Sequence, residues 1–136
     1  MIPIRDEIKT HRTPVVNYLL ILTNVAVFLL TLVFNRNPED VFFEFALIPY
    51  QIKQGLDLGD MRNILTSMFM HAGWFHLLGN MLYLWIFGDN IEDRLGHFKY
   101  LLFYIVGGFF AAFAHYMTNP SSTVPTVGAS GAVAAV

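Results

Sequence analysis

The most constraining feature of this chain is an uninterrupted apolar run at residues 15–34, which contains no charged side chain. A helix of about 20 residues is long enough to cross the hydrocarbon core of a bilayer, roughly 30 Å thick. The run is too long for a signal-peptide core, and Asn-Arg-Asn-Pro-Glu-Asp follows it instead of a small-residue cleavage site. We therefore predict a retained first transmembrane helix.

The composition supports a membrane protein. Charged residues make up 13% of the 136 residues, against about 25% in soluble domains. The net charge of −2 gives no reason to expect a nucleic-acid partner. The chain has no cysteine, which excludes disulfides and thiolate metal sites. The expected surroundings are therefore a lipid bilayer.

Three further apolar runs follow, at residues 64–87, 98–117 and 126–136. The runs at 64–87 and 98–117 have the length of membrane spans. The run at 98–117 also carries a stripe of small residues suited to close helix packing. That stripe consists of Gly107, Gly108, Ala111 and Ala112. Together the runs predict an all-α, polytopic membrane bundle formed by a single domain over residues 1–136.

The run at residues 126–136 has about half the length that a span needs. A helix ending there would leave its last carbonyl groups unpaired in hydrocarbon. We therefore expect three spans and the start of a fourth, and an incomplete domain.

Residues 36–62 form the long connection between the first two runs. Asn37 is suited to cap a helix, Pro38 to occupy its first position, and acidic residues follow. Apolar residues then repeat at helical spacing, which favours a short amphipathic helix at the membrane interface. A core helix of a small soluble cap is the less favoured alternative.

The distribution of Lys and Arg predicts the orientation. Cations before the first span and between the second and third outnumber those in the long connection, and the last loop has none. The cations on the first side are Arg5, Lys9, Arg12, Arg94 and Lys99, and those on the other side are Arg36, Lys53 and Arg62. We expect a cytoplasmic N-terminus, as in a bacterial inner membrane, so that the second and fourth runs begin at the outer side.

Two polar side chains, His76 and Asn80, interrupt the second run. Their spacing puts them within about 40° on one helix face, whereas His71 is rotated by about 140° from His76 and need not share their role. Polar side chains in hydrocarbon mark functional sites or hold helices together by hydrogen bonds. The second run alone leaves both interpretations open.

The sequence Gly-Ala-Ser-Gly at residues 128–131 opens the fourth run. A serine among small residues more commonly serves close packing. On the predicted orientation, however, Ser130 lies at the depth of His76 and Asn80. A serine nucleophile, the N–H of a neutral buried imidazole, an amide and backbone N–H groups are the parts of a hydrolytic site that binds an oxyanion.

These residues resemble the rhomboid family of intramembrane serine proteases. The motifs are His-Ala-Gly-Trp-Phe-His-Leu-Leu-Gly-Asn at residues 71–80, Gly-Ala-Ser-Gly at 128–131 and Glu-Asp-Arg at 92–94. The resemblance implies a six-helix bundle with a water-filled cavity that opens outward. It also implies cleavage of transmembrane segments of other proteins, without a metal or a cofactor.

The resemblance further assigns roles to single residues. Ser130 would be the nucleophile, and His76 with Asn80 would donate to the oxyanion. The supporting positions would be His71 near the cavity mouth, Gly128 for tight packing or close substrate approach, and Gly131 for close approach of the fourth helix.

The family takes its general base from a histidine of the sixth helix, which is absent from this sequence, so we expect the chain as given to be inactive. His97 is expected on the cytoplasmic side, away from Ser130. His115, near the outer end of the third run, is expected to cap that helix or line the cavity in preference to acting as the base. Two other functions stay open: an inactive relative that binds transmembrane clients, and a channel whose polar residues line a proton path.

Overall fold

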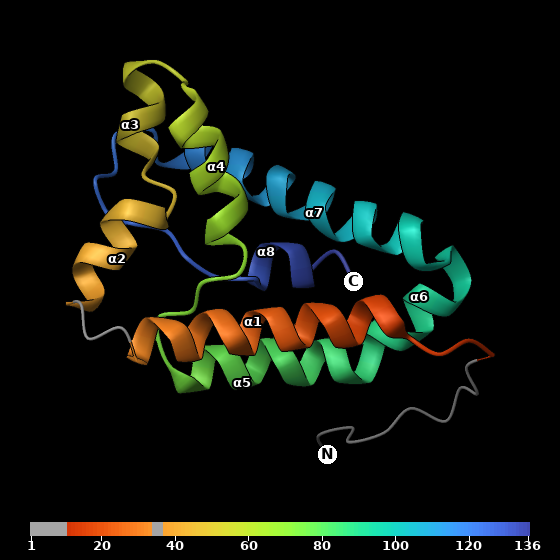
Figure 1. Cartoon of the computed structure of the whole chain (residues 1–136). Coiled ribbons are helices and arrows are strands. Elements are labelled where there is room, and N and C mark those ends of the chain that lie inside the picture. The colour runs from red at the N-terminus through yellow and green to blue at the C-terminus, as the bar shows by residue number, and fades with distance from the viewer. Residues whose placement is uncertain (1–10, 34–36) are drawn as a thin grey trace.

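The chain forms an assembly of helices in the computed structural model, which describes residues 11–33 and 37–136 (Figure 1). The helices are α1 (Val15–Val33), α2 (Pro38–Phe45), α3 (Pro49–Gln54), α4 (Leu58–Ser67), α5 (Trp74–Tyr83), the π-helix η1 (Leu84–Gly88), α6 (Asp89–Leu95), α7 (His97–Thr118) and α8 (Ser130–Val133). The fold class is therefore the helical one that the sequence predicted. Three cations used for the predicted orientation, Arg5, Lys9 and Arg36, lie outside the described residues, as does Phe34.

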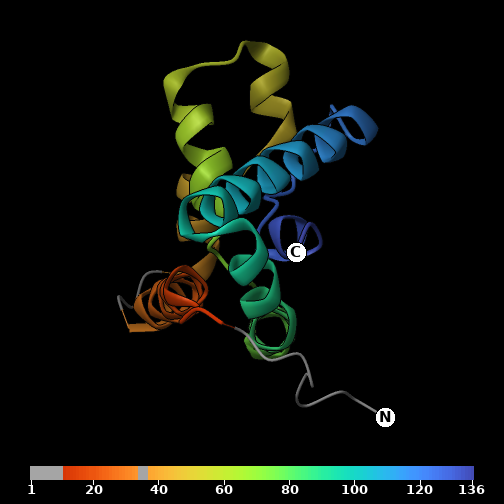
Figure 2. The same cartoon turned by 90° about the vertical axis from the view of Figure 1, so that its right-hand side faces the viewer.

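Helices α1 and α5 lie side by side, and α7 crosses above them (Figures 1 and 2). The short helix α8 lies between these two levels and contacts both α7 and α5. Helices α2, α3 and α4 form a lobe at one end of the molecule, in which α4 contacts α7 while α2 contacts α1 and α4. By length and composition, α1 and α7 could each cross a membrane, and they correspond to the predicted runs at 15–34 and 98–117.

The predicted second span at 64–87 is wrong in its boundaries. Helix α4 ends at Ser67, and the backbone is not helical again until Trp74. From there a continuous helical path runs through α5, η1 and α6 to Leu95. The extended backbone of Gly73 (φ −178°, ψ 172°) marks the break. An apolar run reports burial in protein or lipid and does not by itself locate a helix end.

The connection at residues 36–62 contains α2, α3 and the start of α4, not the single short helix that was expected. Asn37 does stand at the N-cap position of α2, but its side chain makes no capping hydrogen bond. Helix α4 has the better cap, because Asp57 and Asp60 exchange side-chain to backbone bonds in a capping box. Arg62 of α4 then donates to the Glu44 carbonyl and so ties α4 to α2.

The predicted small-residue stripe on α7 is confirmed as a packing surface. An ideal Cβ on Gly107 would lie 2.6 Å from Ala135 Cβ, and one on Gly108 would lie 2.5 Å from Met68 Sδ. Both distances are far below van der Waals contact. The absence of side chains at these positions therefore allows α4 and the C-terminal segment to approach α7.

The expected fourth helix does not begin at residue 126. Helix α8 starts at Ser130. Thr126, in the loop before it, forms an isolated antiparallel bridge with Leu47. Helix α8 still approaches α7 closely, since a Cβ on Gly131 would lie 2.3 Å from Ala111 Cβ. The chain after α7 is thus held as an extended loop before it turns into α8.

A buried polar network joins the start of α1 to η1 and α6. The Glu92 carboxylate accepts hydrogen bonds from the backbone N–H groups of Val16 and Asn17, at 2.9 and 2.7 Å. The Asn17 amide donates to the Leu84 carbonyl at 2.9 Å, and Tyr100 Oη donates to Asn17 Oδ1 at 2.9 Å. Leu84 begins the π-helix, whose irregular hydrogen bonding makes an added donor useful.

Candidate active site

Ser130 and His76 meet at Gly128, although they belong to different helices. An ideal Cβ on Gly128 would lie 2.4 Å from His76 Cε1, 2.8 Å from His76 Nε2 and 3.4 Å from Ser130 Oγ. The imidazole and the hydroxyl therefore border the same small space. Gly128 also has φ +130°, in the region that favours glycine. Glycine is thus required here both by the backbone conformation and by the close approach of His76.

Asn80 lies one turn after His76 on α5, and its amide is bonded to a different histidine. Asn80 Nδ2 lies 3.1 Å from His71 Nε2, and both side chains are buried. The rings of His71 and His76 pack edge to face, with centroids 5.1 Å apart. A chain of contacts therefore runs from Asn80 through His71 to His76.

The rotation of about 140° expected between His71 and His76 is wrong. It assumed that one helix continues through residue 71, where His71 would point away from the shared face. In the structure His71 precedes the first residue of α5, in the loop that follows α4. The loop turns the ring back toward the face of α5, and a helical rotation does not apply. His71 is also buried, with 2% of its surface exposed.

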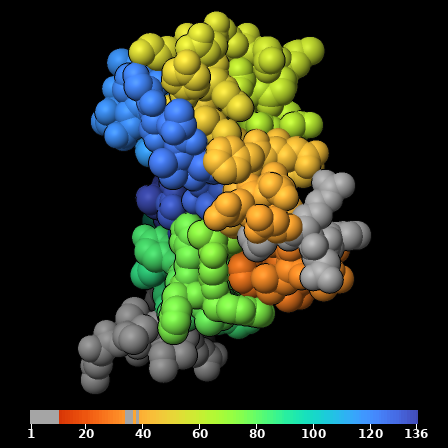
Figure 3. Space-filling model, turned by 90° about the vertical axis from the view of Figure 1, so that its left-hand side faces the viewer, coloured from red at the N-terminus to blue at the C-terminus, as the bar shows by residue number. Residues whose placement is uncertain are grey.

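A cavity of ≈ 190 Å³ lies beside Ser130, between α4, α7 and the loop that precedes α8. His115, Thr126, Gly128, Ser130 and Gly131 are among its lining residues. Ser130 itself is exposed and His76 is half-buried. The face seen in Figure 3 carries the loop before α8 (blue) between the lobe of α3 and α4 above and the start of α5 (green) below.

His97 and His115 have different surroundings. His97 Nδ1 contacts the Glu92 carboxylate in the network at the start of α1. His115 lies in the last turn of α7 and lines the cavity that Ser130 also lines, with its Nε2 atom 2.8 Å from Thr126 Oγ1. The cavity-lining position expected for His115 is the one observed.

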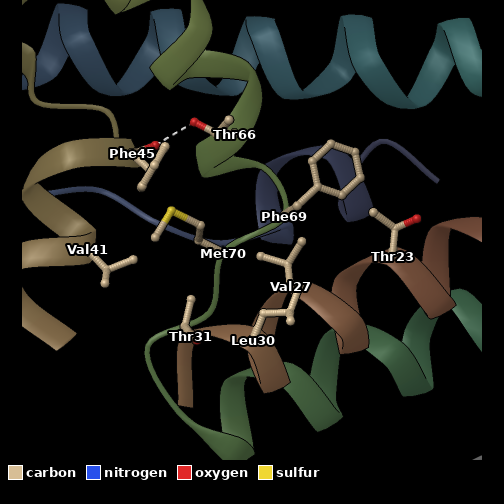
Figure 4. Close-up of a pocket in the computed structure, with 9 residues that line it drawn as sticks. All are labelled: Thr23, Val27, Leu30, Thr31, Val41, Phe45, Thr66, Phe69 and Met70. Atoms are coloured by element: carbon tan, nitrogen blue, oxygen red, sulfur yellow. Dashed lines mark hydrogen bonds between the residues drawn. The ribbon is translucent and has the colours of Figure 1, made fainter. Parts of the chain in front are cut away.

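A second, larger hollow of ≈ 490 Å³ lies between α1, α2 and α4 (Figure 4). Its walls are mainly apolar, and each of its three hydroxyl groups already donates to a backbone carbonyl. Those hydroxyls belong to Thr23, Thr31 and Thr66, which bond the carbonyls of Leu19, Phe28 and Phe45. The hollow lacks the polar groups that hydrolysis needs, in contrast to the surroundings of Ser130.

The chain is similar to known proteins over its second half. The family model for the rhomboid domain matches residues 58–136. This match covers more than half of the chain, and the protein belongs to the rhomboid family. Membership of that family, together with two apolar helices of spanning length, makes it an integral membrane protein.

Individual relatives are also rhomboid proteins by name. Rhomboid-like protein 11, chloroplastic, of Arabidopsis thaliana is 41% identical over 68 residues, which are 50% of this chain and 24% of the relative. The putative rhomboid protease YdcA of Bacillus subtilis is 35% identical over 79 residues, 58% of this chain and 39% of the relative. Rhomboid protease GluP of Bacillus subtilis is 35% identical over 75 residues, 55% of this chain and 14% of the relative.

The chain thus spans well under half the length of these relatives. No solved structure matches the chain at a significant level.

Proposed function

We propose that this protein is an intramembrane serine protease that hydrolyses peptide bonds in transmembrane segments of other membrane proteins. The observation that supports it most directly is that Ser130 Oγ and the His76 ring both lie next to Gly128, where a Cβ would displace His76 and touch Ser130 Oγ. Two relatives named as rhomboid proteases, at 35% identity, agree with this function.

In the proposed reaction, Ser130 Oγ attacks the scissile carbonyl carbon and its proton passes to a general base. The carbonyl oxygen becomes an oxyanion, for which His76 and Asn80 are the proposed donors. Each such donor is worth about 3–4 kcal/mol of barrier. The amine leaves with a proton, and water then hydrolyses the acyl-enzyme ester. The resemblance implies that the base is a histidine of a later helix. His71 then supports the oxyanion donors, since it bonds Asn80 and packs on His76.

A fluorophosphonate probe tests the nucleophile, because it forms a covalent bond with an activated serine. The protein at its native length, in its own membrane, should be labelled, and Ser130→Ala should abolish the labelling. Ser121→Ala is the matched control, since Ser121 is an exposed serine of the loop before α8 that bonds Lys53, and its loss should leave labelling unchanged. A folded wild-type protein that stays unlabelled would favour the inactive, client-binding alternative.

We propose that the N-terminus is cytoplasmic and that the candidate site faces the outer side of the membrane. The sequence has no cysteine, so single cysteines can report the sidedness of each loop. Ser121→Cys in intact cells should react with a membrane-impermeant maleimide, whereas Lys99→Cys should react only after permeabilisation. The reverse pattern would refute this orientation and move the candidate site to the inner leaflet.

A further inference from the structure

The part of the loop nearest Ser130, residues 126–128, is attached to three different parts of the fold. Thr126 exchanges backbone hydrogen bonds with Leu47 in the loop after α2, with N···O distances of 2.8 and 3.3 Å. The Gly128 N–H donates to the Ser67 carbonyl at the end of α4, at 2.9 Å. These are backbone bonds, which most side chains at residue 126 would leave intact.

The third attachment depends on side chains. Thr126 Oγ1 lies 2.8 Å from His115 Nε2, a hydrogen bond from the loop to the last turn of α7. It joins residues that are 11 positions apart, on either side of the turn after α7. The bond therefore ties the loop to α7, a helix of 22 residues.

The same two side chains line the cavity that Ser130 lines. Three residues separate Thr126 from Ser130, and the middle one, Gly128, has no side chain and lies close to the His76 ring. A shift of Thr126 is therefore passed along a short stretch of backbone to Ser130, with His76 on one side and the cavity on the other.

We propose that His115 is a positioning residue for the nucleophile. Through Thr126 it fixes the loop so that Ser130 Oγ stays beside His76. The effect of this role on catalysis rests on the proposed protease function. A positioning residue differs from a general base, because the proton of Ser130 does not pass to His115.

The test compares removal of the bond with its conservative replacement in the native-length protein. His115→Leu and Thr126→Val remove the bond, whereas His115→Gln and Thr126→Ser retain a hydrogen-bonding group at each end. We expect the rate of fluorophosphonate modification of Ser130 to fall by about 10-fold in the first pair, since small misplacements of reacting groups are costly. The second pair should stay within about twofold of wild type, with an unchanged pH profile. The double variant His115→Leu/Thr126→Val should be no slower than either single variant, because both act through one bond.

Amide hydrogen exchange of the segment at residues 126–136 gives a readout that does not depend on activity. Exchange should rise in His115→Leu and Thr126→Val and stay at the wild-type level in His115→Gln and Thr126→Ser. Unchanged exchange in the first pair would overturn the proposal. A second result would also overturn it: a His115→Gln variant that reacts as slowly as His115→Leu and lacks one limb of the pH profile. That result would make His115 the general base. A wild-type protein that the probe does not modify would overturn the proposed function, while the exchange data would still decide whether the bond holds the loop.

Discussion

Gly128→Ala is expected to slow the reaction of Ser130 by about 100-fold while the protein stays folded, because a displacement of about 1 Å in a catalytic group has an effect of this size. The added methyl group would lie 2.4 Å from His76 Cε1 and 3.4 Å from Ser130 Oγ. The first distance is shorter than any tolerated contact, so His76 or the loop must move. The φ of +130° adds backbone strain. The measurement is the second-order rate constant for the fluorophosphonate probe, together with thermal unfolding in detergent.

Two other glycines separate the causes. Gly79→Ala adds a methyl group within α5, between His76 and Asn80, where no atom lies within 4 Å, and it should leave the rate unchanged. Gly55→Ala imposes similar backbone strain at φ +144° with nothing nearby, and should lower stability without changing the rate. A Gly128→Ala protein with the wild-type rate would show that the contact between His76 and the loop is irrelevant to reactivity.

Sequence reasoning could single out Ser130 and His76, because a polar side chain in an apolar run is conspicuous. That both approach Gly128 is visible only in the structure. The partner of Asn80 could not be anticipated in the same way. Whether His71 faces Asn80 depends on where α5 begins, and apart from His71 itself no polar side chain marks the non-helical residues 68–73. Gly73 stands at the break in the structure, but a glycine in an apolar run does not by itself fix where a helix begins.

The attachment of Ser130's loop was also beyond sequence reasoning. Thr126 pairs with Leu47 across 79 positions, and neither residue has a type that suggests a partner. The Glu-Asp-Arg sequence at residues 92–94 could be recognised only as a family pattern. Its contact with the start of α1 joins residues 75 and 76 positions apart, and no local periodicity encodes such a distance.

Glu92→Ala is expected to lower the free energy of unfolding by roughly 3–5 kcal/mol, as found when one partner of a buried charged group is removed. Glu92 is 1% exposed and accepts from two of the first backbone N–H groups of α1. Those N–H groups have no partner within the helix, and the carboxylate also favours the positive end of the helix dipole. Its loss would leave the Val16 and Asn17 N–H groups and the His97 ring without this acceptor. Denaturant unfolding in mixed micelles measures the change.

Two neighbouring substitutions make this prediction specific. Glu92→Gln keeps one acceptor oxygen without the charge, so it should lower the free energy of unfolding by less, roughly 1–3 kcal/mol. Asp93→Ala removes a carboxylate that accepts from the His11 and Arg12 N–H groups in an exposed setting, and should cost at most about 1 kcal/mol. If Asp93→Ala were as destabilising as Glu92→Ala, the effect would reflect net charge near α6. If instead Glu92→Ala lowers the free energy of unfolding most, Glu92→Gln less and Asp93→Ala least, the buried Glu92 cap is what joins α1 to α6. It then also stabilises the arrangement of helices that holds α5, with His76 and Asn80, in place.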